Sequence, residues 1–403
     1  MSAKSLGFDA ARLQRIDAFF AEKYLAPGKL PCTLTMVARG GEVAHLGVQG
    51  FADVERKEKI TEDTVFRIYS MTKPITSAAF MMLVEEGKVA LDDPVHRFIP
   101  AWRELGVFDA GFVGAFKTHR PSRPMLMVDL LRHTSGLTYG FQNRTNVDAA
   151  YRKKGIGELP HKGTLDVMIE ELANIPLEFS PGDAWNYSVS TDVLGYLVEK
   201  ISGKPFPQFL KERIFDPLGM VDTAFEVAPG AAERFASCYM ASPTGGILKQ
   251  DDARNSEYLK PPLFVSGGGG LVSTAGDYLK FCRMFLNGGE LGGKHLLGRK
   301  TIELMTMNHL PGGKYLTDLS KSLFSEVAYD GVGFGLGFAV TADPAKTLLP
   351  GSVGEYSWGG AASTYFWIDP KEELIAIFMT QLLPSTLYPL RRELRTLVYS
   401  ALA

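Results

Sequence analysis

The stretch that decides the fold is YSMTKP, residues 69–74, together with the apolar run over residues 75–86 that follows it. Ser70 is the only serine in the chain with a lysine three residues later. The apolar run stops at Gly87, a pattern typical of a buried helix with a glycine at its end. We therefore expect Ser70 and Lys73 in the first turn of this helix, on one face.

This spacing indicates nucleophilic catalysis. A serine hydroxyl is a weak nucleophile until a base takes its proton, and a neutral lysine one helical turn away can take it. The helix N-terminus also presents free N–H groups, so the backbone amide of Ser70 can form half of an oxyanion hole. The alternative is that Ser70 only caps the helix and Lys73 is solvated, because S-x-x-K also arises by chance.

Two further motifs support a catalytic interpretation. PGDAWNYSVS, residues 181–190, is typical of a turn that leads into a helix, where the Tyr187 hydroxyl can project into a cleft as a second base. SWGGA, residues 357–361, precedes a predicted strand, and its paired glycines let the backbone approach a ligand and present an N–H. A β-bulge is the alternative interpretation of these glycines.

Four motifs occur in one order along the chain: YSMTK at 69–73, HTSGL at 133–137, PGDAWNYS at 181–188 and WGGA at 358–361. In them the sequence resembles the serine β-lactamase and penicillin-binding protein superfamily. Within it, the chain looks most like the family VIII carboxylesterases, which are esterases with a class C β-lactamase fold. The resemblance covers nearly the whole chain.

The resemblance implies a role for each matching residue. Ser70 would be the acylated nucleophile, Lys73 its general base, and Tyr187 the base that moves protons to and from the leaving group. The remaining implied residues are the oxyanion amides of Ser70 and Ala361 and the substrate-binding residues Trp358, Gly359 and Gly360.

The sequence departs from the β-lactamase pattern at two positions. Val189 stands where the superfamily's Y-x-N motif has asparagine, and Trp358 stands where its K-T-G motif has lysine. An indole cannot give a substrate carboxylate the charge-assisted contact of a lysine. We therefore expect poor binding of anionic β-lactams and a preference for neutral esters, unless an arginine elsewhere supplies the anchor.

Strand patterns lie at both ends of the chain and helix patterns between them. Apolar spacing predicts a first helix over 13–24, strands at 33–38 and 43–48 around a Gly40-Gly41 turn, strands at 335–341, 363–368 and 374–379, and a last helix over 388–402. Helices are predicted over 126–133, 165–172, 191–201 and 274–286.

These elements predict an α/β (α+β) fold of the β-lactamase/transpeptidase type, an antiparallel sheet flanked by the terminal helices with a mostly helical insertion. The expected domains are 1–90 with 270–403, which form the sheet domain, and 91–269, the helical domain. The active-site cleft would lie between them.

The composition argues against nucleic-acid binding and membrane binding. The 403 residues carry a formal net charge of -2, which provides no field for nucleic acid or an anionic membrane. No apolar run reaches the length of a membrane span, no signal peptide is recognisable, and the three cysteines leave one thiol over from any disulfide. We therefore expect a cytoplasmic protein whose partner is a small molecule.

Other catalytic motifs are missing. The chain has no G-x-S-x-G and no H-E-x-x-H, and SGGGGL at 266–271 lacks the lysine of a P-loop, so it is interpreted as a flexible wall of the cleft. His133 is interpreted as a structural hydrogen-bonding residue. No metal and no cofactor are expected.

The sequence thus predicts a serine carboxylesterase that cleaves neutral esters through an acyl intermediate on Ser70. The alternatives are a β-lactamase or D-alanyl peptidase, an acyltransferase to an alcohol, and a non-catalytic binding or sensor protein with this fold. The natural ester, its acyl-chain length and the oligomeric state stay open.

Overall fold

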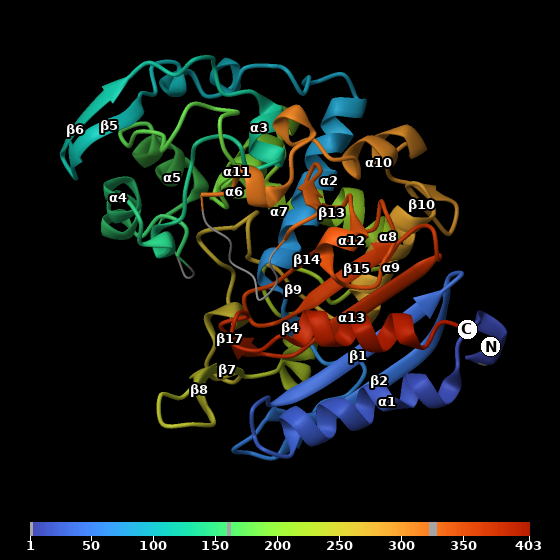
Figure 1. Ribbon diagram of the computed structural model, residues 1–403. Coiled ribbons are helices and arrows are strands. Elements are labelled where there is room, and N and C mark those ends of the chain that lie inside the picture. Colours follow the sequence, from blue (N-terminus) through green and yellow to red (C-terminus); the bar gives the residue numbers. More distant parts are fainter. Residues whose placement is uncertain (1–2, 159–162, 322–328) are drawn as a thin grey trace.

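The computed structural model describes residues 3–158, 163–321 and 329–403 (Figure 1). Within them, an eight-stranded antiparallel sheet has the order β12-β13-β14-β15-β16-β1-β2-β3. Its strands come from the two ends of the chain: β1 Cys32–Arg39, β2 Glu42–Asp53, β3 Glu58–Lys59, β12 Val332–Phe334, β13 Ala339–Thr341, β14 Tyr356–Gly359, β15 Tyr365–Asp369 and β16 Leu374–Met379.

The centre of the sheet joins the two ends of the chain. Strand β1 pairs with β16, with Leu34 opposite Met379, and with β2 through the predicted turn at Gly40 and Gly41. Both glycines have positive φ (56° and 81°), as a two-residue hairpin turn of this kind requires. The predicted hairpin is therefore confirmed.

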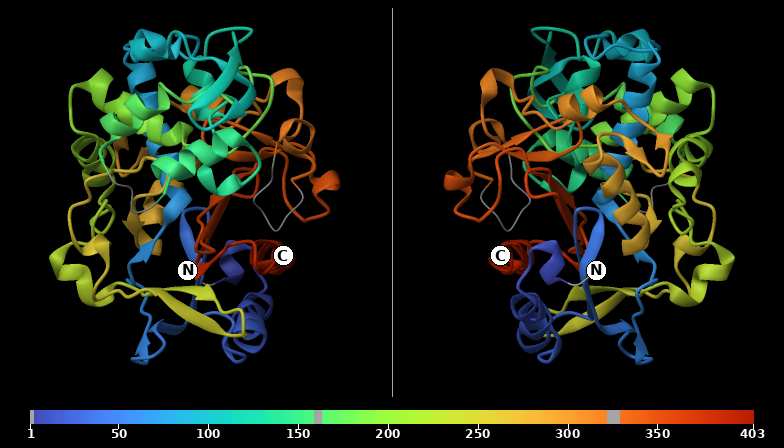
Figure 2. Two further views of the ribbon diagram at one scale, coloured as in Figure 1. Left: turned by 90° about the vertical axis from the view of Figure 1, so that its left-hand side faces the viewer. Right: turned by 90° about the vertical axis from the view of Figure 1, so that its right-hand side faces the viewer.

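Terminal helices cover one face of the sheet. Helix α1, Ala10–Phe20, continues as a π-helical turn over Ala21–Leu25, and α13, Leu390–Ser400, lies beside it (Figure 1). Their apolar side chains share one core with the sheet: Leu13, Ile16, Phe20, Leu390, Leu394, Val37, Trp367 and Phe378. Asp9 N donates to Ala401 O, so the two ends of the chain lie together (Figure 2). The predicted sheet flanked by terminal helices is confirmed.

The other face of the sheet carries α9, Ala275–Leu286, whose Tyr278 ring lies 4.9 Å from that of Phe366. Helix α2, Thr72–Glu85, belongs to the same core and packs against α6 of the helical region. That region contains α3 Met127–Leu131, α4 Asn146–Lys154, α5 Leu165–Leu172, α6 Ser190–Ser202, α7 Phe206–Leu210 and α8 Asp216–Leu218.

Shorter elements complete the described chain. Further strands are β4 Phe66–Arg67, β5 Val107–Phe112, β6 Ala115–His119, β7 Cys238–Ala241, β8 Ile247–Asp251, β9 Val272–Ser273, β10 Glu290–Leu291, β11 Lys294–His295 and β17 Leu382–Leu383. Further helices are α10 Arg299–Met305, α11 Leu316–Leu319 and α12 Pro344–Thr347. The hairpin β5–β6 and the pair β7–β8 lie within the region predicted as mostly helical. The domain boundaries themselves stay a prediction.

The single strand predicted over 335–341 is wrong in its first half. Residues 335–338 turn the chain between β12 and β13, where Gly337 has a φ of 102°. A Cβ on Gly335 would lie 2.2 Å from the Met305 carbonyl oxygen. The apolar residues Leu336 and Phe338 are buried, so their alternation gives the same pattern as a strand.

Candidate active site

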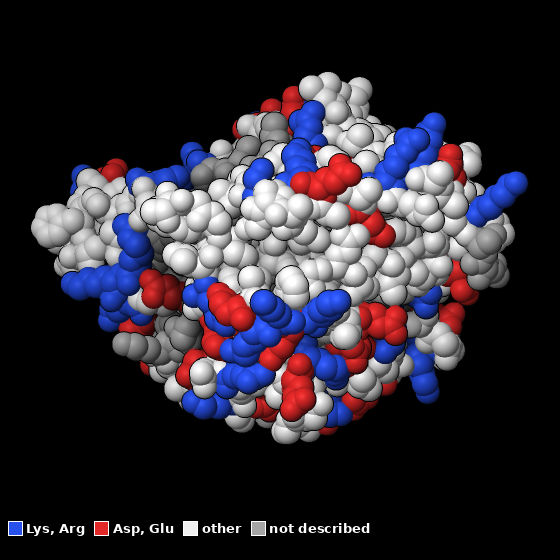
Figure 3. Space-filling model, turned by 90° about the horizontal axis from the view of Figure 1, so that it is seen from below, with Lys and Arg blue, Asp and Glu red and all other residues white. Residues whose placement is uncertain are grey.

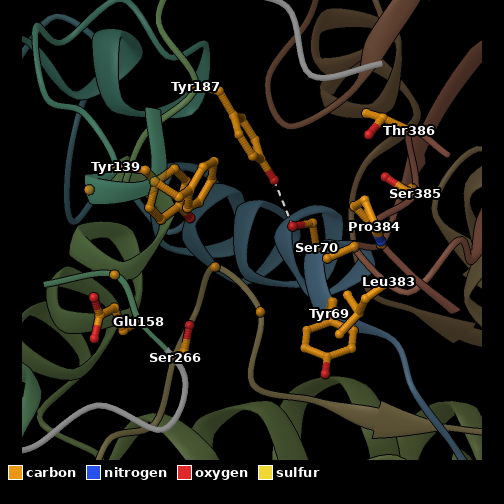
Figure 4. Close-up of a pocket in the computed structure, with 18 of the residues that line it drawn as sticks. Tyr69, Ser70, Tyr139, Glu158, Tyr187, Ser266, Leu383, Pro384, Ser385 and Thr386 are labelled. Carbon is orange, nitrogen blue, oxygen red and sulfur yellow. Dashed lines mark hydrogen bonds between the residues drawn. The ribbon is translucent and has the colours of Figure 1, made fainter. Parts of the chain in front are cut away.

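A pocket of about 800 Å³ opens around Ser70 (Figure 4). Its lining comes from both ends of the chain and from the helical region between them. The residues used below are Ser70, Tyr139, Phe141, Tyr187, Ser266, Gly268, Trp358, Ala361 and Arg391. The predicted nucleophile, second base and oxyanion residues therefore share one cavity.

Ser70 lies in a 3-10 turn, Tyr69–Met71, immediately before α2 rather than inside its first turn. The preceding residue, Tyr69, has a φ of 42°, a left-handed backbone conformation that residues other than glycine rarely adopt. Arg67, in β4, is fully buried and donates to Asp251 and to the Ala236 carbonyl, which holds the strand that leads into this turn.

Lys73 is 2% exposed and its Nζ has three polar partners. It donates to Ser70 Oγ at 3.2 Å, to Tyr139 Oη at 3.1 Å and to the Gly268 carbonyl oxygen at 2.6 Å. An ammonium group has three N–H donors, so these partners satisfy its charged form completely. If Lys73 loses one proton while keeping the bonds to Tyr139 and Gly268, its lone pair faces Ser70.

Tyr187 approaches Ser70 from the helical region, and its hydroxyl donates to Ser70 Oγ at 2.6 Å (Figure 4). The Lys73 Nζ lies 4.5 Å from the centre of the Tyr187 ring. Gln142 Nε2 donates to the Tyr187 carbonyl oxygen at 2.6 Å, which fixes the backbone of this loop. The structure thus brings the three predicted catalytic side chains together.

Tyr139 is a site residue that the sequence interpretation missed. It stands two positions after the last residue of HTSGL, but no spacing rule connects it to Ser70. Burial, and then the nearby Asp192 carboxylate, raise its pKa well above the usual range, so the phenol stays protonated. Tyr139 therefore serves Lys73 as a hydrogen-bond partner and not as a base.

His133 contacts Ser188 Oγ through Nδ1 at 3.2 Å. Burial, and then the charge on Lys73, lower the pKa of His133 well below its usual range, so the ring is neutral. Its ring packs 5.1 Å from the Tyr187 ring. The expected structural hydrogen bond is present.

The glycine-rich segment 266–271 lines the pocket, as predicted, but it is not merely a wall. Its Gly268 carbonyl accepts from Lys73, and Thr76 Oγ1 donates to the Gly267 carbonyl at 2.8 Å. Because the segment is buried and bonded to α2, its backbone is part of the polar surroundings of Lys73.

Trp358 and Gly359 end strand β14, and residues 360–364 turn the chain into β15. A Cβ on Gly360 would lie 2.4 Å from the Ile68 carbonyl oxygen, and one on Gly359 would lie 2.5 Å from an Arg391 nitrogen. The two glycines thus allow close protein packing, and both line the pocket, so their approach to a ligand stays a prediction. This packing brings Ala361 beside the Ser70 turn in the pocket.

The two departures from the β-lactamase pattern, Trp358 and Val189, are both buried, and one arginine lies near the first of them. Trp358 is 7% exposed, and its ring lies 5.4 Å from that of Tyr187. Val189 is fully buried. Arg391, on α13, lines the pocket, donates to the Gly360 carbonyl oxygen at 3.3 Å and lies over the Tyr365 ring. A cation therefore does border the pocket, although it comes from a helix and is already bonded to protein groups.

Chemically, the arrangement can activate a hydroxyl nucleophile. Ser70 Oγ lies between a phenol and a primary amine, each within hydrogen-bonding distance. The described residues contain no group of three or more His, Cys, Asp or Glu placed to hold a metal ion, and no helix among them is long and apolar enough to cross a membrane.

Comparisons with known proteins find similar chains over nearly the whole length. A family model described as Beta-lactamase matches residues 19–400. Esterase EstB of Burkholderia gladioli is 31% identical over 99% of this chain and 100% of its own, and Protein Rv1367c of Mycobacterium tuberculosis is 38% identical over 89% of this chain and 87% of its own. The solved structure of EstCE1, described as a hydrolase with promiscuous acyltransferase activity, has a TM-score of 0.81 at 26% identity over 98% of this chain and 99% of that one.

Proposed function

Because the chain belongs to the beta-lactamase family and has the fold of its serine hydrolases, we propose that it is a carboxylesterase that hydrolyses neutral esters through an acyl intermediate on Ser70. The observation that carries the proposal is the position of Ser70 Oγ, 2.6 Å from Tyr187 Oη and 3.2 Å from Lys73 Nζ. Two groups that can exchange a proton thus contact one hydroxyl.

The reaction follows from these contacts. The Ser70 hydroxyl gives its proton to neutral Lys73 as Oγ attacks the ester carbonyl carbon, and the amides of Ser70 and Ala361 stabilise the oxyanion. The C–O bond to the alcohol then breaks, and the alcohol leaves with a proton relayed through Tyr187. Water, deprotonated by the same pair, attacks the acyl carbon and releases the acid and the Ser70 hydroxyl.

The choice of a neutral ester rests on the pocket wall. Trp358 packs beside Tyr187, in the place that the resemblance assigns to a lysine, and presents an apolar ring. EstB, which shares 31% identity with the chain, is named an esterase. A small-molecule substrate also suits the charge balance of the chain, whose formal net charge is -2, and on the face drawn in Figure 3 acidic and basic side chains are interspersed.

A second candidate activity is acyl transfer to an alcohol, favoured by the promiscuous acyltransferase activity in the description of EstCE1. It needs the same acyl intermediate, with an alcohol in place of water. We further propose a cytoplasmic location, because all three cysteines are buried and unpaired, as suits a reducing compartment.

The test compares kcat/KM of the purified protein for p-nitrophenyl butyrate and for the cephalosporin nitrocefin. We expect the ester to be preferred by at least about tenfold, the cost of one missing charge-assisted contact. Equal rates would replace the carboxylesterase with a β-lactamase. Labelling of Ser70 by a fluorophosphonate without turnover of any ester would indicate a binding protein, and added 1-butanol that yields butyl ester would show acyl transfer.

A further inference from the structure

Asp192 is a buried carboxylate close to Lys73 that neither the motifs nor the proposed reaction uses. It is the third residue of α6, Ser190–Ser202, and is 1% exposed. A carboxylate at this depth requires hydrogen-bond donors, because burial removes its hydration. Its donors show what the residue holds in place.

Asp192 Oδ1 accepts two hydrogen bonds from the glycine-rich segment. Ser266 Oγ donates at 2.5 Å and the Gly268 backbone N–H at 3.0 Å. The carbonyl of the same Gly268 accepts from Lys73 Nζ at 2.6 Å. Gly268 therefore connects the carboxylate to the lysine through its own two backbone groups.

At Gly268, the position that a side chain would occupy faces the same carboxylate. A Cβ there would lie 2.7 Å from Asp192 Oδ2 and 3.0 Å from Tyr139 Oη. The carboxylate and the phenol thus border one glycine, and the phenol contacts the amine of Lys73 directly, since Tyr139 Oη accepts from it. The negative charge of Asp192 acts on Lys73 through a buried, poorly screened region.

We propose that Asp192 is a positioning residue for Lys73: it holds the Gly268 carbonyl against the amine, and its charge sets the pH dependence of Ser70 activation. The inference rests on the proposed function, because it concerns the activation of Ser70. Its observable consequence is the midpoint of the rise of activity with pH.

The neighbouring histidine and tyrosines do not supply the negative charge that we assign to Asp192. His133 is kept neutral by its lowered pKa, and Tyr139 is kept protonated by its raised pKa. Tyr187 contacts Ser70 and lies under the amine. Two acidic side chains line the pocket among its described residues, Glu158 and Asp192; Glu158 is exposed to solvent, whereas Asp192 is buried and bonded to the Gly268 N–H.

The experiment measures the rate of Ser70 phosphonylation by a fluorophosphonate between pH 5 and 10. Fluoride leaves phosphorus as the Oγ–P bond forms, and the Ser70 proton goes to the base, so the rate reports nucleophile activation without ester turnover. For Asp192→Asn we expect a midpoint about one pH unit lower, because a lost negative charge makes the ammonium less favourable. The maximum rate should fall as well.

Ser266→Ala provides the opposite sign. It keeps the carboxylate but removes the hydroxyl dipole that partly compensates its charge, so the midpoint should move to higher pH by a few tenths of a unit. Thr76→Val loosens the same segment without touching Asp192 and should lower the rate at an unchanged midpoint. Asp166→Asn, an exposed carboxylate paired with Lys200, should change nothing.

The outcomes separate cleanly. If Asp192→Asn loses rate but keeps the wild-type midpoint, or if Thr76→Val shifts the midpoint equally, Asp192 is only structural and the inference is overturned. If Asp192→Asn does not fold, Ser266→Ala decides, and an unchanged or lower midpoint overturns the inference. Wild-type labelling at Ser70 without hydrolysis of any ester contradicts the proposed carboxylesterase alone, because the midpoints can still be compared.

Discussion

Two parts of the same pocket differ in how firmly the protein holds them. The acylation centre, which we define as Ser70, Lys73, Tyr139 and Tyr187, is joined by hydrogen bonds at 2.6 to 3.2 Å. The pocket rim, which we define as Phe141, Asn143, Glu158, Pro384 and Thr386, is exposed to solvent. Lys73 is 2% exposed, whereas Phe141 is 53% exposed.

This difference indicates that the acylation centre carries out the reaction and that the pocket rim determines which substrates bind. In the centre, removal of one group breaks hydrogen bonds that hold the reacting atoms in place, so changes there should lower activity most. At the rim, water can replace a lost contact. Trp358 lies between these extremes, because it is 7% exposed and contacts the centre through the Tyr187 ring. Variants should therefore rank by their distance from Ser70 Oγ.

The largest effect is expected for Ser70→Ala. Removing the nucleophile should lower kcat for p-nitrophenyl butyrate by at least about 10⁴-fold, while thermal unfolding stays close to that of the wild type. Mass spectrometry after phosphonate treatment should place the adduct on the peptide that contains Ser70. An adduct on another peptide of a fully active protein would overturn the assignment.

Lys73→Arg should lower kcat nearly as much, on the order of 10³-fold. A guanidinium does not deprotonate at the pH of the assay, and it is too bulky for the three acceptors that hold the lysine amine. Lys200→Arg, at an exposed lysine paired with Asp166, is the matched control and should keep full activity. Wild-type kcat in Lys73→Arg would mean that the lysine only holds structure.

Tyr187→Phe removes one oxygen and keeps the ring between Lys73 and Trp358. We expect a loss of roughly 10²-fold in kcat/KM, the usual contribution of a general acid–base group. Steady-state kinetics with p-nitrophenyl butyrate measures it, and circular dichroism checks the fold. A loss below about threefold would assign the proton transfer to Lys73 alone.

The sequence identified the parts of the centre that local motifs encode. Ser70 and Lys73 lie one turn apart, and Tyr187 stands in a turn before a helix, so short-range patterns suffice for them. Tyr139 and Gly268 reach Lys73 through tertiary contacts across 66 and 195 positions of sequence. No periodicity reports such contacts, and Asp192 is missed for the same reason.

The fold shows the same division. The long strands β1, β2 and β16 and the terminal helices were predicted because their apolar periods are sustained. Strands β12 and β13 have three residues each, and the turn between them contains buried Leu336. A strand this short is defined by its neighbours, so its ends cannot be recognised from composition alone.

The smallest effect is expected for a change at Trp358, which lies between the acylation centre and the pocket rim. Trp358→Lys adds a cation where the resemblance implies that a β-lactam carboxylate would bind, and it also removes a ring that packs against Tyr187 and Phe334. We expect the ratio of kcat/KM for nitrocefin to that for p-nitrophenyl butyrate to rise by about ten- to a hundredfold, the worth of one charge-assisted hydrogen bond.

Trp358→Met is the control, because it loses the ring and stays neutral. It should lower both rates together and leave their ratio unchanged. If Trp358→Met raises the ratio as much as Trp358→Lys, the indole excludes cephalosporins by size and not by charge. If wild type already hydrolyses nitrocefin as fast as the ester, we expect Arg391, which lines the pocket and donates to the Gly360 carbonyl oxygen, to be the anchor, and Arg391→Leu should then abolish nitrocefin turnover while sparing the ester.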